Sequence, residues 1–249
     1  MSERIVSAAV IIIGNEILSG RTQDTNLRDI AVSLGAWGIR VAEARVVPDV
    51  AETIVAVVNE LRERYDYVLT TGGIGPTHDD ITAESISTAF GVQLIEHPEI
   101  AALIRRRDAP AEIMASRLRM ALVPEGASLI ENTTGGPPGF YIGNVYVLAG
   151  IPAVMRAMLA SLQSKLTGGA VLLSKSVTMF VSESTIAEPL RNLQAAYPDV
   201  EIGSYPFNRE GRFGTILVAR STDTAMLDTV IEKLEAMIPS AQQLPGPNE

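Results

Sequence analysis

Between residues 6 and 90, apolar segments alternate with segments of helical spacing, and this alternation constrains the fold more than any other feature. Apolar runs suited to strands cover Val6 to Ile13, Ile39 to Val47 and Tyr67 to Thr71. Amphipathic patterns typical of helices occupy Asn26 to Trp37, Val50 to Arg64 and Thr82 to Phe90. This βαβ succession predicts a three-layer α/β domain, in which helices cover both faces of a mostly parallel sheet.

The pattern is less regular in the rest of the chain. Helical spacing covers residues 98–122, with an interruption at Pro110, and short apolar runs at 127–130 and 145–148 precede a further helical pattern over 152–166. Thr167-Gly168-Gly169 then separates the α/β domain, residues 4–167, from residues 170–238, whose βαββα order predicts a small α+β domain. Residues 239–249 are rich in Pro, Gln and Gly and are expected to be a disordered tail.

Composition excludes several functional classes. The 249 residues are 47% hydrophobic, which is enough for one or two cores. A formal net charge of -9 argues against a nucleic-acid partner, because such binding depends on Lys and Arg that neutralise phosphates. The chain has no cysteine, which excludes disulfides and thiolate metal sites and agrees with a cytoplasmic location. The apolar run from Ile5 to Ile13 is too short to span a bilayer, so no membrane association is expected.

Residues 71–82 have the composition of a phosphate site. Their sequence, Thr-Gly-Gly-Ile-Gly-Pro-Thr-His-Asp-Asp-Ile-Thr, places three glycines, hydroxyl side chains and two adjacent carboxylates between a predicted strand and a predicted helix. Ligands of parallel sheets bind beyond the carboxyl ends of the strands, where free backbone N–H groups face an anion. We therefore expect Gly72, Gly73, Gly75 and Thr77 to hold a phosphate group.

The two acids of this segment have two interpretations. Asp79 and Asp80 could cap the following helix and interact with its dipole. Alternatively, both carboxylates could turn toward one ligand and hold a hard divalent ion such as Mg²⁺, Mn²⁺ or Co²⁺. His78 beside them could act as an acid or a base near neutral pH.

Other polar residues follow the remaining predicted strands. Glu16 comes just after the first strand and is either a surface acid in a turn or a second acid at the same sheet edge. Asn26 and Asp49 stand where helix caps would be. Residues 135–140 contain three glycines and two prolines, which indicates either an ordinary rigid turn or a loop whose backbone approaches a ligand.

Together, these segments resemble the molybdopterin-binding (MoaB/Mog-like) family, and in particular its CinA-like branch and the related amino-terminal domain of FAD synthases. Six motifs occur in the order of the family, at residues 14–20, 24–26, 47–49, 71–82, 135–140 and 148–152. The resemblance covers about residues 4–165, and the segment after them is similar to the small domain that follows in CinA-like proteins. The deamidase domain of CinA proteins is expected to be absent from this chain.

The resemblance implies a site for a small-molecule nucleotide or pterin phosphate. In the CinA-like branch it implies a divalent-metal-dependent pyrophosphatase acting on ADP-ribose or FAD-like dinucleotides. The alternative is a molybdopterin-binding protein of molybdenum cofactor biosynthesis without pyrophosphatase activity, and a regulator that senses a nucleotide is a third hypothesis. Because related folds often assemble, a homo-oligomer is expected.

The resemblance also implies roles for individual residues. It makes Glu16, Asp79 and Asp80 metal ligands and part of the catalytic machinery, with His78 beside them. Asn26 and Asp49 would position the substrate, and the loop that contains Gly135, Gly136 and Gly139 would contact it. Three places depart from the family: CinA-like sequences often have Thr in place of Asn15 and Lys in place of His78, and the loop at residues 135–140 lacks the Thr-Ala that the family frequently has there. FAD synthase domains share the His, which shifts the expected substrate toward FAD-like dinucleotides.

Overall fold

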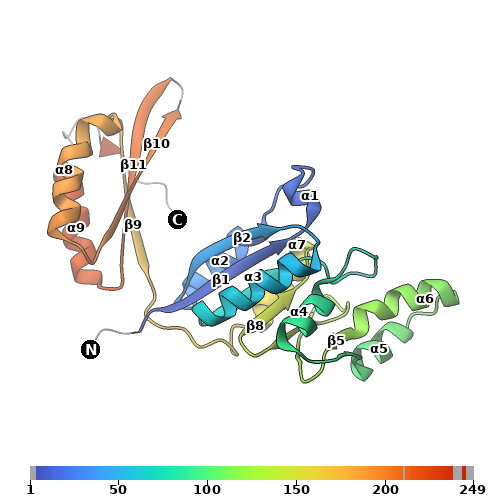
Figure 1. The fold of residues 1–249 in the computed structure, drawn as a ribbon. Helices are drawn as coiled ribbons and strands as arrows, with labels where there is room; N and C mark the ends of the chain where they lie inside the picture. The colour runs from blue at the N-terminus through green and yellow to red at the C-terminus, as the bar shows by residue number, and fades with distance from the viewer. Residues whose placement is uncertain (1–3, 210, 238–242, 245–249) are drawn as a thin grey trace. The chain divides into compact units, whose positions relative to one another are not determined.

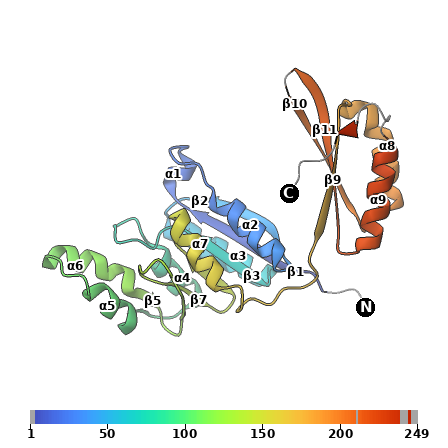
Figure 2. The same cartoon turned by 180° about the vertical axis from the view of Figure 1, so that it is seen from behind.

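The computed structural model describes residues 4–209, 211–237 and 243–244. The chain forms two compact units, which divide between Ala170 and Val171 (Figures 1 and 2). The first is an α/β unit with a mostly parallel sheet, and the second is a small α+β unit. The predicted fold class is therefore confirmed for both parts of the chain.

A six-stranded sheet with the order β2-β1-β3-β8-β7-β6 forms the centre of the first unit. Its parallel strands are β1 (Val6–Ile13), β2 (Ile39–Val47), β3 (Tyr67–Thr71) and β8 (Val145–Leu148). β7 (Gly139–Ile142) and β6 (Ser128–Ile130) extend the sheet with antiparallel pairing. The chain passes from β1 to β2 on one side and returns to β3 on the other, so the direction of winding reverses between β1 and β3. Ligands of open α/β sheets bind at the carboxyl ends of strands at such a point.

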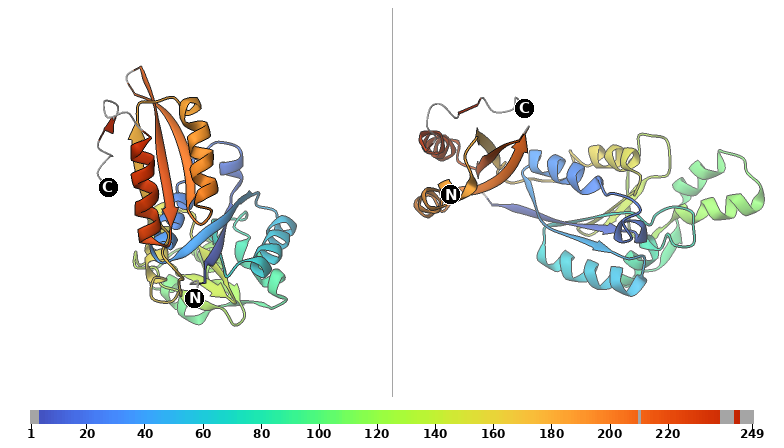
Figure 3. Two further views of the ribbon diagram at one scale, coloured as in Figure 1. Left: turned by 90° about the vertical axis from the view of Figure 1, so that its left-hand side faces the viewer. Right: turned by 90° about the horizontal axis from the view of Figure 1, so that it is seen from above.

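Helices cover both faces of this sheet (Figure 3, right). α2 (Asn26–Ala36) and α7 (Pro152–Ser161) pack on one face, and α3 (Ala51–Arg64) and α4 (Thr82–Phe90) pack on the other. Because side chains alternate along a strand, β1 supplies Val10 and Ile12 to the first core and Ile11 and Ile13 to the second. Its continuous apolar run is thus explained by burial on both sides.

Smaller elements connect β3 to β6. The helical region interrupted at Pro110 is confirmed as α5 (Pro98–Arg105) and α6 (Ala111–Leu118), which lie at the side of the sheet away from β2 (Figures 1 and 2). A short 3₁₀ helix, η1 (Arg119–Ala121), follows α6, and β4 (Leu94–Glu96) pairs with β5 (Leu122–Pro124). These three short elements were not predicted, and neither was α1 (Asn15–Leu18). Within the described part of the chain, no helix is long and apolar enough to cross a membrane.

The second unit has the predicted βαββα order. It consists of β9 (Leu173–Met179), α8 (Glu183–Ala196), β10 (Glu201–Arg209), β11 (Arg212–Ser221) and α9 (Thr224–Ala236). Both helices share one core with the sheet. In the segment expected to be a disordered tail, Gln243–Leu244 forms β12, which pairs with β9, and residues 239–242 and 245–249 lie outside the described residues.

Candidate functional site

A cavity of about 550 Å³ lies at the carboxyl ends of the central parallel strands. Six residues singled out in the sequence line it: Glu16, Gly72, Gly73, Gly75, Asp80 and Gly136. A smaller hollow beside it shares Glu16 and Gly72 with the cavity and adds Asn26. The segments after β1, β3 and β8, together with the loop before β7, therefore meet in one place.

The glycine turn after β3 is folded tightly against its neighbours. Gly72 and Gly73 have φ angles of 107° and 67°, which side-chain-bearing residues rarely adopt. A Cβ on Gly72 would lie 2.1 Å from the Ile13 carbonyl oxygen, and one on Gly73 would lie 2.2 Å from Oγ1 of Thr82. The Thr82 hydroxyl donates to the Gly72 carbonyl at 2.9 Å. The turn thus has no room for side chains and keeps its backbone at the cavity wall.

N–H groups of this turn, those of Gly73 and Gly75 among them, are free to bind an anion. Within residues 4–209, the structure shows no acceptor for the N–H of Gly73 or of Gly75. Both residues line the cavity. Because backbone N–H groups near a helix N-terminus attract negative charge, this wall can bind phosphate oxygens.

Asp80 closes the second half of the same loop. Its Oδ2 accepts hydrogen bonds from the Thr77 N–H at 2.8 Å and from the Thr77 hydroxyl at 2.6 Å. The helix cap of α4 is Ile81, and no side chain caps this helix. The capping interpretation of Asp79 and Asp80 is therefore wrong, and Asp80 instead shapes the loop and lines the cavity.

Asp79 and His78 are not brought into the cavity wall. Their side chains are 60% and 97% exposed, with 3.9 Å between His78 Nδ1 and Asp79 Oδ1. The Thr77 hydroxyl and the backbone N–H of Asp79 itself hold the pKa of the Asp79 carboxyl below its ordinary value. Asp79 is thus ionised at neutral pH but faces solvent.

Glu16 and Asp49 are connected through the backbone between β1 and α1. The Glu16 carboxylate lies over Gly14, where a Cβ would come within 2.5 Å of Oε1. Oδ2 of Asp49 accepts a hydrogen bond from the Asn15 N–H at 2.8 Å, and no side chain caps α3. The interpretation of Asp49 as a helix cap is therefore wrong. Its carboxylate instead anchors the segment that carries Glu16.

Asn26 connects the ends of two strands. Only 4% of the residue is exposed, and Nδ2 donates to Oγ1 of Thr71 at 2.7 Å and to the Gly150 carbonyl at 2.8 Å. Its Oδ1 is buried and has no partner within the described residues. Capping of the first turn of α2 is done by Asp24, which accepts a hydrogen bond from the Leu27 N–H at 3.0 Å.

The three glycines of residues 135–140 have different environments. Gly136 lines the cavity, whereas Gly135 adopts a φ of 79° in the turn before it. Gly139 begins β7, where a Cβ would lie 2.4 Å from the Val147 carbonyl oxygen of β8. Only Gly136 of the three is thus positioned to contact a ligand of the cavity, and Gly139 is required for strand packing.

The structure adds residues that the sequence did not indicate. Arg119 of η1 lines the cavity, as do several apolar side chains, Met120, Leu122, Phe140, Val154 and Met158. These come from four different elements: η1, β5, β7 and α7. No local motif marks them, because they converge only through tertiary packing.

The side chains that line the cavity decide whether it could hold a metal ion. Among the described residues, no group of three or more His, Cys, Asp or Glu side chains is arranged to hold a metal. Of the three predicted ligands, Glu16 and Asp80 line the cavity and Asp79 does not. Two carboxylates fit Mg²⁺, which commonly takes one or two protein carboxylates and completes its shell with phosphate oxygens and water.

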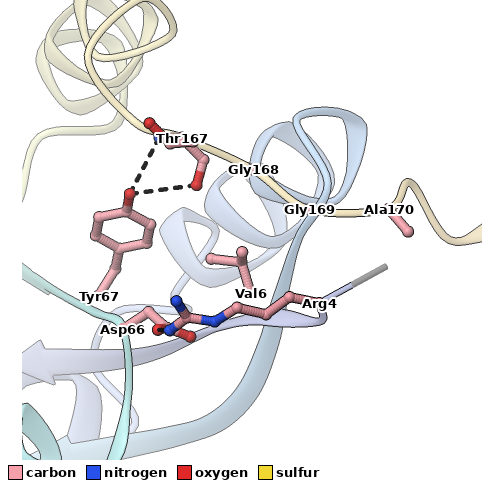
Figure 4. A pocket seen from close by; sticks show the side chains of 8 residues that line it. All are labelled: Arg4, Val6, Asp66, Tyr67, Thr167, Gly168, Gly169 and Ala170. Carbon is pink, nitrogen blue, oxygen red and sulfur yellow. Dashed lines mark hydrogen bonds and ion pairs between the residues drawn. The ribbon is translucent and has the colours of Figure 1, made fainter. Parts of the chain in front are cut away.

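A second hollow, of about 580 Å³, lies near the amino ends of β1 and β3 (Figure 4). Its polar groups bind one another: Arg4 pairs with Asp66, and the Tyr67 hydroxyl bonds to both the N–H and the carbonyl of Thr167, at 3.0 and 3.2 Å. Asp66 also accepts from the Ser7 N–H, which holds the pKa of its carboxyl below the ordinary value. These contacts fasten the segment after α7 to the sheet and leave little for a ligand.

Comparison with known proteins identifies relatives for both units. Residues 9–167 match the family model described as "Probable molybdopterin binding domain", and residues 171–245 match "FAD synthase, middle domain". A CinA-like protein of Gloeobacter violaceus is 34% identical over 246 residues, covering 93% of this chain and 57% of that protein. A protein of Archaeoglobus fulgidus is 34% identical over 197 residues, covering 79% of this chain and 84% of that protein.

A solved structure agrees with these matches. The crystal structure of the protein CinA with unknown function from Thermoplasma acidophilum has 35% sequence identity and a TM-score of 0.60, and the match covers 64% of this chain and 96% of that one. The chain spans about half the length of the CinA-like relatives that it matches.

Proposed function

The chain belongs to the family of probable molybdopterin-binding domains and to its CinA-like branch, and we propose that it is a divalent-metal-dependent pyrophosphatase of ADP-ribose or FAD-like dinucleotides. One observation carries the proposal. The free N–H groups of Gly73 and Gly75 and the carboxylates of Glu16 and Asp80 belong to the wall of a single cavity. A phosphate group and a divalent cation can therefore be bound side by side.

The phosphate end of the cavity is the glycine turn. Its N–H groups donate to phosphate oxygens, and the nearby N-terminus of α4 adds the positive end of a helix dipole. The backbone there is held by the Thr82 hydroxyl on one side and by Asp80 on the other. Because these donors are fixed before the ligand arrives, binding requires little ordering of the loop.

The apolar part of the cavity suits a flat ring. Phe140, Val154 and Met158 contribute hydrophobic surface to the wall, and Pro137 and Pro138 add rigid edges. Adenine, flavin and pterin rings all gain from burial against such surface. The cavity therefore has the division that a nucleotide needs, with polar groups for phosphate and apolar groups for the ring.

Glu16 and Asp80 would hold the divalent ion, Mg²⁺, Mn²⁺ or Co²⁺, which when bound supplies charge neutralisation at phosphate and a more acidic water. In the hydrolysis, the oxygen of one water joins one phosphorus, the bond from that phosphorus to the bridging oxygen breaks, and two phosphate monoesters result. Oδ2 of Asp80 is engaged by Thr77. Glu16 is therefore the carboxylate better able to accept the proton of the attacking water.

The test is incubation of the purified protein with ADP-ribose or FAD, with each metal in turn and with EDTA. We expect AMP to form with metal and not with EDTA. We expect Asp80→Asn to lower the rate by about a hundredfold, because it removes a charge that acts in the transition state, while Glu84→Gln on the exposed side of α4 leaves the rate unchanged. Absence of AMP with every metal would refute the proposal.

A second candidate is a molybdopterin-binding protein of molybdenum cofactor biosynthesis that releases no AMP. The description of the matching family model favours it, and the same cavity can take a pterin phosphate. Pterin fluorescence in the purified protein, together with no hydrolysis of either dinucleotide, would select this candidate. The cytoplasmic location and the homo-oligomer stay predictions from the sequence.

A further inference from the structure

The positive charge of the cavity comes from one side chain. Among the described residues that line it, Arg119 is the only Lys or Arg, whereas Glu16 and Asp80 contribute two carboxylates. Arg119 is exposed, and within the described residues the structure shows no hydrogen bond or ion pair for its side chain. A guanidinium without a partner, in a cavity whose wall can bind phosphate oxygens, is available to an anionic ligand.

Three other arginines of the first unit have partners of their own. Arg105 pairs with Glu96 at 3.0 Å, Arg117 donates to the Arg107 carbonyl at 3.3 Å, and Arg156 pairs with Asp29 at 2.9 Å. Of these three side chains, none lines the cavity. Arg119 therefore differs from these three arginines both in its position at the cavity and in its lack of a partner among the described residues.

The backbone that carries Arg119 is firmly anchored. Ala121, two residues later, is fully buried, and its carbonyl accepts a hydrogen bond from the His97 N–H at 2.8 Å. Met120 packs against the core beneath α4, and β5 pairs with β4 directly after η1. Because this segment is fixed, the guanidinium starts from a defined point at the rim of the cavity.

We propose that Arg119 is a specificity residue that binds the second phosphate of the ligand, so that the cavity prefers nucleoside diphosphates and diphosphate-bridged dinucleotides to nucleoside monophosphates. This inference rests on the proposed function. The free N–H groups of the glycine turn suit one phosphate group, and two carboxylates in the same wall disfavour a further negative charge. Arg119, a planar cation with five donors in the same wall, offsets that repulsion and can bind two oxygens at once.

The experiment measures binding of ADP and of AMP by calorimetry, in the presence of Mg²⁺, to the full chain and to three variants. We expect the wild type to bind ADP more tightly than AMP. In Arg119→Gln, the affinity for ADP should fall about tenfold, the size expected for a lost charge-assisted hydrogen bond, and the affinity for AMP should change by less than about twofold. Arg119→Lys should fall between, since it keeps the charge without the bidentate geometry. Arg117→Gln is the matched control and should keep the wild-type ratio.

The ratio of the two affinities separates specificity from damage to the fold, because a structural defect would weaken both ligands together. Equal losses for ADP and AMP in Arg119→Gln, or no loss for either, would overturn the inference. Hydrolysis of ADP-ribose is measured in parallel. An Arg119-dependent ratio without any hydrolysis would support the inference and refute the pyrophosphatase proposal. Hydrolysis of ADP-ribose together with an unchanged ADP-to-AMP affinity ratio in Arg119→Gln would support the pyrophosphatase proposal and overturn the inference about Arg119. A wild type that binds neither nucleotide would overturn both.

Discussion

Gly75 and Asp80 are packed so closely that a Cβ on residue 75 would lie 2.5 Å from Oδ2 of Asp80. The same oxygen accepts both hydrogen bonds from Thr77. The position of the carboxylate in the cavity wall thus depends on the absence of a side chain five residues earlier. This makes Gly75 a means of moving Asp80 without removing it.

Replacing Gly75 with Ala should therefore affect the site more than the fold. The group that must move is the end of a side chain and not backbone, so we expect the free energy of unfolding to change by less than about 0.5 kcal/mol. Displacement of the carboxylate should lower the rate of dinucleotide hydrolysis by about a hundredfold. Gly35→Ala is the control, because a Cβ there meets nothing within 4 Å. It should leave the rate unchanged. Equal rates for the two variants would contradict this role of Gly75.

The buried amide of Asn26 gives a prediction about stability. Asn26→Ala removes the two hydrogen bonds to Thr71 and Gly150 and leaves the buried Thr71 hydroxyl and the Gly150 carbonyl short of a donor. We expect a loss of about 1–3 kcal/mol in the free energy of unfolding. Urea unfolding followed by the fluorescence of Trp37, the only tryptophan, measures it in the first unit.

Asn59→Ala on α3 is the comparison for this variant. The Asn59 side chain accepts a single hydrogen bond, from Arg62 three residues later. Since that contact is near the surface, its loss should cost less than about 0.5 kcal/mol. If both variants unfold at the same urea concentration, the hydrogen bonds of Asn26 contribute no more to the stability of the first unit than the surface contact of Asn59 does.

The fold was predictable because its main elements have strong local signals. The apolar runs of β1, β2 and β3 and the periodic segments between them are visible without tertiary information. β7 was missed because Gly139–Ile142 follows glycines and prolines, whose turn chemistry dominates the local pattern. Its pairing with β8 is a tertiary contact, and a short segment does not reveal it.

The site was predictable where residues follow directly after parallel strands. Glu16 and the glycine turn lie in one wall because the carboxyl ends of β1 and β3 adjoin. The hydrogen bonds of Asn26 could not be predicted from the local sequence, since its partners are 45 and 124 residues away. Arg119 was missed for the same reason: only the packing of η1 turns a residue of an ordinary helical pattern toward the cavity.

Acid stability should depend on Glu60. Arg45 binds this carboxylate with two hydrogen bonds, at 2.7 and 2.5 Å, and lowers its pKa in the folded chain to about 2, from an ordinary value of 4.5. A lowered pKa contributes stability above the unfolded value, and that contribution is lost as the pH falls from about 4.5 to about 2. Glu60→Gln should therefore reduce the loss of stability over this pH range.

The measurement is the urea midpoint of Trp37 fluorescence at neutral pH and at several values down to pH 2, a range set by the lowered pKa of Glu60. The exposed Glu63 on the same helix provides the control variant, Glu63→Gln, which changes net charge equally. We expect the acid dependence of this control to match the wild type. Identical acid profiles for the wild type and Glu60→Gln would show that the ion pair with Arg45 is too well screened to matter.

Metal binding should require the nucleotide. Two carboxylates, Glu16 and Asp80, line the cavity, and no cluster of three metal-binding side chains exists among the described residues. A Mg²⁺ ion, which demands six oxygens and gives up water reluctantly, should therefore bind weakly until phosphate oxygens complete its shell. We expect Mg²⁺ alone to leave the melting temperature unchanged, ADP alone to raise it slightly, and both together to raise it by more than the sum. The gain follows from ligand binding to the folded state only. In Asp80→Asn the excess over the sum should disappear. If Mg²⁺ alone raised the melting temperature as much as Mg²⁺ and ADP together, the protein would bind the ion without the nucleotide. That result would contradict coordination of the ion by carboxylate and phosphate oxygens together.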